Sequence, residues 1–119
     1  SKSLPANLRH DESRWFRFAG WSLDAVTRNL TSADGVVVPL SGTEFKLLRV
    51  LLDHPGRVLT RDQLIELMLS RDAGPFDRAL DVQISRLRQR LGDDAKEPAI
   101  IKTVRGQGYV LAAVVTREA

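Results

Sequence analysis

The feature that most limits how this chain can fold is a helical repeat of leucine and isoleucine in its C-terminal third. In a helix, which turns by about 100° per residue, these side chains fall in one narrow apolar stripe. The stripe consists of Leu80, Ile84, Leu87 and Leu91. Gly92 follows the last of them, as is typical after the end of a helix. The pattern therefore predicts a helix from about Asp77 or Arg78 to Leu91, with one side packed against a core.

The opposite face of this helix is polar and basic. It carries Arg78, Val82, Ser85, Arg86 and Gln89, with Asp81 and Arg88 at its flank. The net charge of +3 arises entirely between Arg78 and Tyr109, which hold seven basic and four acidic residues, whereas the rest of the chain holds eleven of each. Such a local excess is typical of a nucleic-acid-binding surface.

Arg86 is the candidate for contact with a base, because its planar guanidinium can donate two hydrogen bonds to guanine. Val82 fits an apolar contact with a thymine methyl group. Polar residues nearer the edges of the face are placed to meet phosphate oxygens instead. These are Arg78, Ser85, Arg88 and Gln89.

Two shorter helices are predicted before this one by their capping boxes. Ser41 stands three residues before Glu44, and that helix ends at His54-Pro55-Gly56. Thr60 and Gln63 repeat the arrangement. Two short helices across a tight connection are typical of a helix-turn-helix, although many all-helical proteins share this geometry.

Short strands are predicted on both sides of the helices. Alternating runs separated by turn residues indicate an antiparallel meander between Trp15 and Leu40. Residues 100–104 and 109–111 predict a hairpin, whose glycines permit a tight turn. Arg105 at its tip is placed to enter a narrow minor groove.

Length and composition suit one globular domain, because the chain has 119 residues and is 43% hydrophobic. We expect a linker or tail over 1–13, the domain over 14–115, and a C-terminal tail over 116–119. No apolar run suits a membrane span, and residues 1–13 lack the apolar stretch of a secretory signal, so we expect a cytoplasmic, nucleoid-associated protein. The absence of cysteine excludes thiolate metal sites.

An enzyme is not expected. The two histidines, His10 and His54, have no visible nucleophile or metal partner, so no cofactor or metal is predicted. The alternative is a domain of the same fold that binds proteins and not DNA. The arginines Arg78, Arg86, Arg88 and Arg105 favour DNA over that alternative.

Five segments in order resemble the OmpR/PhoB-type effector domains of response regulators over about residues 15–113. They are FAGWSLD (18–24) with RNL (28–30), LSGTEFKLL (40–48), GRVLTRDQL (56–64), RALDVQISRLR (78–88) and IKTVRGQGY (101–109). The resemblance implies an α+β winged helix-turn-helix with an N-terminal four-stranded antiparallel sheet, a three-helix core and a C-terminal β-hairpin wing. It also implies regulation of transcription, with the third helix in the major groove and the wing in the minor groove.

The resemblance extends the set of candidate contacts. Base edges are expected to meet Ala79, Asp81, Val82 and Arg86. The sugar-phosphate backbone is expected to meet Arg78, Gln83, Ser85, Arg88, Gln89, Lys102, Thr103, Gly106 and Tyr109. Arg105 is expected to enter the minor groove.

Further partners are implied by the same resemblance. The loop from about Leu69 to Asp77 resembles a surface that contacts RNA polymerase, although it also suits a plain connector. Its candidate residues are Ser70, Arg71, Asp72, Gly74 and Pro75. Relatives carry a receiver domain that a sensor kinase phosphorylates, and they bind direct repeats head to tail. We therefore expect a monomer in isolation and a head-to-tail dimer on double-stranded DNA.

Overall fold

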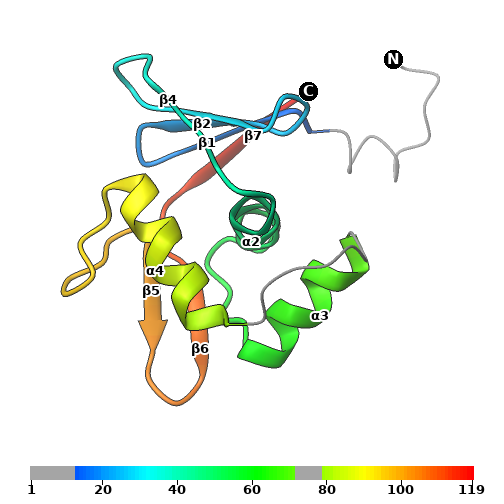
Figure 1. Ribbon diagram of the computed structural model, residues 1–119, viewed down its shortest axis with the longest axis vertical. Helices are drawn as coiled ribbons and strands as arrows, with labels where there is room; N and C mark the ends of the chain where they lie inside the picture. The colour runs from blue at the N-terminus through cyan, green and yellow to red at the C-terminus, as the bar shows by residue number, and fades with distance from the viewer. Residues whose placement is uncertain (1–12, 72–78) are drawn as a thin grey trace.

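The computed structural model in Figure 1 describes residues 13–71 and 79–119. The elements in chain order are β1 (Trp15–Phe18), β2 (Trp21–Asp24), β3 (Asn29–Thr31), β4 (Val37–Val38), α2 (Gly42–Asp53), α3 (Arg61–Arg71), α4 (Leu80–Leu91), β5 (Ile101–Val104), β6 (Gly108–Leu111) and β7 (Val115–Glu118). Two antiparallel sheets and three helices over these residues confirm the predicted α+β class.

The first sheet has one strand more than the four expected. Its order is β4-β3-β2-β1-β7, and β7 comes from residues that we had assigned mainly to a C-terminal tail. Trp15 pairs with Glu118 across the β1–β7 ladder. Arg117 of β7 stacks 5.4 Å from the ring centre of Phe16 and donates a 3.3 Å hydrogen bond to the Asp53 carbonyl. These partners lie far away in the sequence, so a four-residue strand carries no local signal of the pairing.

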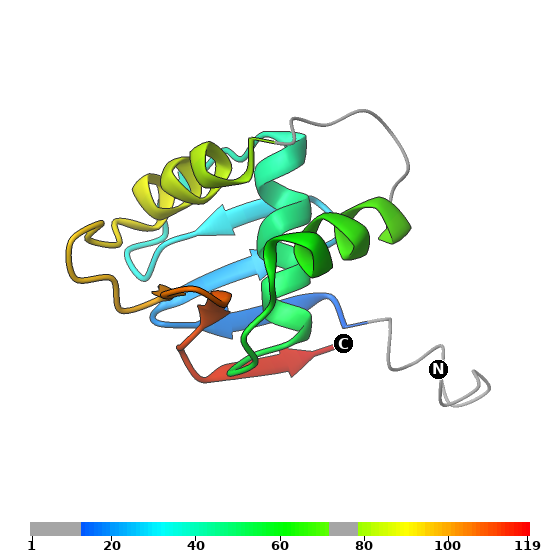
Figure 2. The ribbon, with the colours of Figure 1, turned by 90° about the horizontal axis from the view of Figure 1, so that it is seen from below.

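Helix α2 lies between this sheet and the other two helices (Figures 1 and 2). Its leucines Leu47, Leu48, Leu51 and Leu52 are fully buried, and so are Phe16, Leu23 and Leu30 from the sheet. Because about 25 cal/mol is gained for each Å² of apolar surface removed from water, this layer supplies much of the stability. It forms the base on which α3, α4 and the hairpin are held.

Both predicted capping boxes are confirmed. The Ser41 hydroxyl accepts from the Glu44 amide, and the Glu44 carboxylate accepts from the Ser41 amide, each at 3.1 Å. Thr60 and Gln63 make the same reciprocal pair at 3.1 and 2.9 Å. Glu44 is only 2% exposed, and it also accepts a 3.1 Å bond from Arg90 of α4. This capping box therefore also ties α4 to α2.

The two ends of helix α4 are capped differently. Its first residue is Leu80, and Ala79 is the N-cap with no side-chain capping bond, since alanine has no acceptor to offer. The predicted start at Asp77 or Arg78 lies outside the described residues. The predicted end is confirmed, because Gly92 adopts a left-handed φ of 66° and caps the helix.

The turn after β2 depends on the buried carboxylate of Asp24. Arg14 donates two hydrogen bonds of 2.9 Å to it, and the Val26 amide donates one of 3.0 Å. The bonds from Arg14, more than those from the backbone, hold the pKa of Asp24 well below its usual range. The carboxylate is thus favoured in its charged form in the folded protein.

We expect Asp24→Asn to lower the free energy of unfolding by about 1–2 kcal/mol at neutral pH, since Arg14 is 44% exposed and water screens part of the interaction. Because the pKa of Asp24 is lower in the folded protein, its charged carboxylate stabilises the fold fully above the unfolded-state pKa of about 3.9. This stabilisation is lost as the pH falls from there through the folded-state pKa. Urea unfolding should therefore show the two proteins converging between pH 5 and about pH 2. The exposed Asp34→Asn serves as control, and a gap independent of pH would contradict the role of Asp24.

Candidate DNA-binding surface

Helix α4 presents the polar face predicted for it. Asp81, Val82, Ser85, Arg86 and Gln89 are exposed, whereas Leu80, Ile84, Leu87 and Leu91 are buried. Val82 keeps 44% of its surface in solvent, although it is apolar. The helix is therefore anchored by its leucine stripe while the arginine-bearing face remains available to a partner.

Gln83 does not belong to that face. It is 2% exposed, so its side chain does not fit the expected contact with a phosphate. Gln83 lies three residues after Leu80 and four before Leu87, which places it beside the apolar stripe, and the parts of the protein that pack there bury it. The resemblance had suggested an outward position that this helix does not provide.

The hairpin of β5 and β6 lies beside α4 (Figure 1). Val104 pairs with Gly108, so residues 105–107 form the tip, and Gly106 there adopts a φ of 75°. Arg105 is exposed at this tip, as predicted for a wing. The strand residues Lys102 and Thr103 are exposed as well.

Leu59, which lies just before α3, joins this helix to the wing. Its amide and carbonyl exchange hydrogen bonds of 2.8 and 2.9 Å with Tyr109. The backbones approach so closely that a Cβ on Gly108 would lie 1.9 Å from the Leu59 carbonyl oxygen. Glycine is therefore required at residue 108 by space.

Arg88 connects α4 to the wing. Its guanidinium donates bonds of 3.0 and 2.8 Å to the Ile101 carbonyl and one of 2.8 Å to the Thr103 hydroxyl. Both Arg88 and Thr103 were predicted to contact phosphates. They lie together at the junction of helix and wing, and the phosphate contact itself stays a prediction.

A second connection comes from Asp93 in the loop after α4. Its carboxylate accepts bonds of 2.8 Å from the Ala99 amide and 2.9 Å from the Ile101 amide. The loop is thereby tied to the first residue of β5. Helix and wing thus have a defined relative position, which a surface that recognises DNA requires.

At the opposite end of α4, the Asp81 carboxylate joins three elements. It accepts hydrogen bonds from the Tyr109 hydroxyl of β6 and from the Arg61 guanidinium of α3. The bond from Tyr109, then that from Arg61, lower the pKa of Asp81. Burial, then the neighbouring carboxylate, raise the pKa of Tyr109, which is 8% exposed. The Tyr109 hydroxyl is directed at a protein partner, in contrast to the phosphate contact expected for it.

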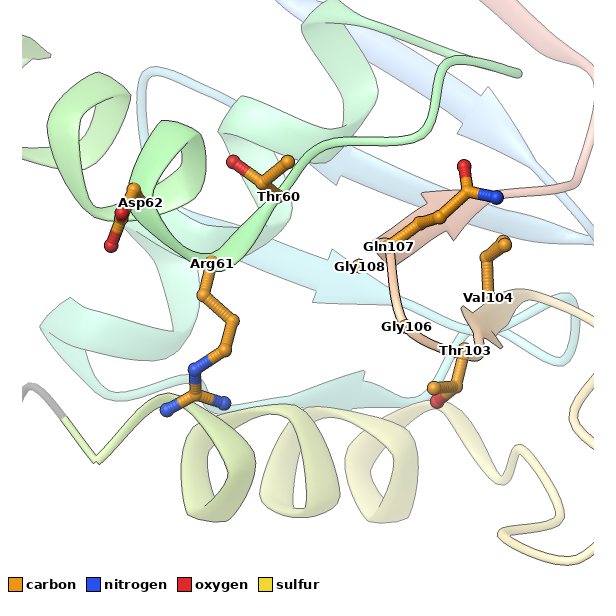
Figure 3. Close-up of a pocket in the computed structure, with 8 residues that line it drawn as sticks. All are labelled: Thr60, Arg61, Asp62, Thr103, Val104, Gly106, Gln107 and Gly108. Carbon is orange, nitrogen blue, oxygen red and sulfur yellow. The ribbon is translucent and has the colours of Figure 1, made fainter.

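Arg61 was not among the predicted site residues. Its only signal in the sequence is its place directly after the N-cap Thr60, within a segment that matches the family pattern. Figure 3 shows its side chain extending from the start of α3 toward α4. It borders an open hollow of about 540 Å³ between α3 and the wing. The hollow is lined by Thr60, Arg61, Asp62, Thr103, Val104, Gly106, Gln107 and Gly108.

Most of the predicted polymerase-contact loop lies outside the described residues, including Asp72, Gly74 and Pro75. Arg78, which was predicted to contact a phosphate, also lies outside them. Arg71 is the last residue of α3. Ser70 is exposed, and its hydroxyl donates a 3.1 Å hydrogen bond to the Leu67 carbonyl. A role for this loop therefore stays a prediction.

Comparison with known proteins identifies the family and the fold. Residues 35–111 match a family of domains described as "Transcriptional regulatory protein, C terminal". This chain belongs to that family. The match confirms the predicted OmpR/PhoB-type effector domain, and a family of transcriptional regulators agrees with the prediction that the chain is not an enzyme.

Relatives of this OmpR/PhoB-type domain include two whole regulators. The transcriptional regulatory protein GltR of Pseudomonas aeruginosa is 47% identical over 82% of this chain and 40% of GltR. The regulatory protein VirG of Agrobacterium fabrum is 41% identical over 92% of this chain and 43% of VirG. The chain thus spans about two fifths of the length of these relatives.

Solved structures confirm the winged-helix fold of this OmpR/PhoB-type domain. The Klebsiella pneumoniae RstA DNA-binding domain in complex with the RstA box superposes with a TM-score of 0.70 at 39% identity, over 83% of this chain and 97% of the other. The Escherichia coli CpxR DNA-binding domain gives a TM-score of 0.66 at 35% identity, over 84% and 97%. In residues 13–71 and 79–119, every helix is too short or too polar to span a bilayer.

Proposed function

We propose that this domain binds double-stranded DNA at specific sequences and regulates transcription as the output domain of a two-component response regulator. The observation that carries the proposal is the exposed face of α4, anchored on its other side and joined to the wing by Arg88. The similarity to RstA, which was solved in complex with its DNA box, supports it. In this proposal α4 enters the major groove and Arg105 enters the minor groove beside it.

The contacts proposed for α4 and the wing follow from exposure and chemistry. Arg86 contacts guanine, and the exposed methyl groups of Val82 meet a thymine methyl group, with Ala79 at the start of the helix nearby. Backbone phosphates are contacted by Arg78, Ser85, Gln89, Lys102, Thr103 and Gly106. Arg88 contacts a phosphate through the guanidinium N–H groups that do not bind Ile101 or Thr103.

We also propose the assembly that the resemblance implies. The domain, residues 14–115 with β7 extending its sheet, is a monomer in isolation and pairs head to tail on direct repeats. The whole protein is cytoplasmic, and a sensor kinase acts on its receiver domain. The loop between α3 and α4 contacts RNA polymerase.

Selection of bound duplexes from a random pool near physiological salt tests the proposal. We expect enrichment of direct repeats whose half-sites lie about one helical turn apart. A domain that binds no duplex even at low salt would instead be a protein-interaction module. That result would overturn the proposed function, since phosphate contacts alone support measurable binding in dilute buffer.

Lys102→Ala tests the electrostatic part of the surface. Lys102 is exposed on β5, so its loss should weaken binding to selected and random duplexes alike and reduce the salt slope by about 0.9. Arg17→Ala is the matched control, because Arg17 is exposed between the buried Phe16 and Phe18, so its loss removes one positive charge from the solvent-facing side of the first sheet. If Lys102→Ala left the salt dependence of DNA affinity unchanged, Lys102 would not be a phosphate contact.

A further inference from the structure

We infer that Asp81, Tyr109 and Arg61 form a clamp that positions the recognition helix for DNA, and that Asp81 acts through this clamp and not by contacting a base. The inference rests on the proposed function. It assigns a positioning role to Asp81, for which the sequence analysis expected a base contact. It assigns the same role to Arg61, for which the sequence analysis expected no role.

The clamp joins the three elements that border the DNA-binding surface. Asp81 lies in the first turn of α4, Arg61 is the first residue of α3, and Tyr109 is in strand β6 of the wing. Both donors bind the same carboxylate oxygen, Oδ1. The carboxylate is therefore oriented toward α3 and the wing by two hydrogen bonds.

The first turn of α4 has particular need of such a contact. Its N-cap, Ala79, makes no side-chain capping bond, because alanine has no side-chain acceptor. The C-terminal half is anchored by Arg88 to the Ile101 carbonyl and by Arg90 to Glu44. Asp81 supplies the corresponding connection at the N-terminal end, where a negative charge also suits the helix dipole.

Charge adds a second reason to expect an effect on DNA binding. Asp81 is 69% exposed on a surface that is to meet phosphates, and an uncompensated carboxylate there would repel them. Arg61 neutralises it. The Tyr109 hydroxyl, on a side chain only 8% exposed, contributes a charge-assisted hydrogen bond from a residue whose backbone is paired with Leu59.

A double-mutant cycle on DNA affinity tests the clamp with the whole chain and the duplex selected from the random pool. Tyr109→Phe keeps the buried ring and removes only the hydroxyl. We expect it to weaken binding about threefold to tenfold in the wild-type chain and less than about 1.5-fold in a chain that carries Asp81→Ala, which leaves the hydroxyl no side-chain acceptor at residue 81. The charge change caused by Asp81→Ala itself cancels in this comparison.

The base preference at each operator position is the second measurement. It should be unchanged by Tyr109→Phe and by Asp81→Asn, because neither removes a base contact in this proposal. Arg86→Ala is the positive control that shows the assay detects a lost base contact. Thermal melting of each variant confirms that the chains compared are equally folded at the assay temperature.

Two results would overturn the clamp while leaving the proposed function intact. One is an equal effect of Tyr109→Phe in both backgrounds, and the other is a changed preference at a single base pair on Asp81→Asn. Failure of the proposed function is recognised separately, because the wild-type chain would then bind no duplex, and the clamp inference would fall with it.

Discussion

Replacing Gly108 with alanine is expected to destabilise the domain by at least about 3 kcal/mol. The added Cβ would lie 1.9 Å from the Leu59 carbonyl oxygen, 2.7 Å from its carbonyl carbon and 2.9 Å from the Thr60 Cα. All three are backbone atoms, which cannot rotate away as a side chain can. The wing would have to separate from residues 59 and 60 and lose the two hydrogen bonds between Leu59 and Tyr109.

Gly106→Ala is the matched control for this prediction. Gly108 and Gly106 both adopt a positive φ, of 154° and 75°, but a Cβ added at Gly106 meets nothing within 4 Å. Its replacement should cost only about 1 kcal/mol, from backbone conformation alone. Urea unfolding of the three proteins compares the two effects, and an equal loss at the two glycines would show that the contact with Leu59 is not limiting.

Replacing Arg86 with alanine is expected to remove about 1–3 kcal/mol of discrimination at one position of the operator. Arg86 is exposed in the middle of the α4 face, where its two parallel donors suit the O6 and N7 acceptors of guanine. Binding to random duplexes should fall much less, because the remaining phosphate contacts stay in place.

Competition assays with operator variants at fixed salt measure this effect. Ser85→Ala is a useful comparison, since Ser85 is the exposed neighbour proposed to contact a phosphate and its loss should weaken all duplexes alike. If Arg86→Ala weakened selected and random duplexes by the same factor, Arg86 would be a phosphate contact and not a base contact.

The exposure of the predicted site residues agrees with the sequence analysis only in part, and the disagreements share one cause. Val82, Ser85, Arg86 and Gln89 are exposed as expected, because a helix repeats with a known angle. Gln83 was placed outward by family resemblance and lies inward. The burial of an uncharged polar residue beside an apolar stripe depends on what packs against it, and helical periodicity alone does not reveal this.

Arg61 was missed by the sequence analysis for the same reason, because its role depends on packing between distant segments. Its importance in this structure comes from Asp81, which lies 20 residues away in the chain, and from Tyr109, which lies 28 residues beyond Asp81. The local sequence around each of these residues gives no sign of the contact. Only the packing of α3, α4 and the wing brings their side chains within hydrogen-bonding distance.

The sequence by itself determined the helix starts at Ser41 and Thr60, the end of α4 at Gly92 and the leucine stripe, because capping and helical periodicity act between residues three or four positions apart. Tertiary structure decided the fifth strand, the burial of Gln83, the clamp around Asp81 and the space that excludes a side chain at Gly108. These features depend on contacts between distant segments, whose geometry exists only after the core has formed.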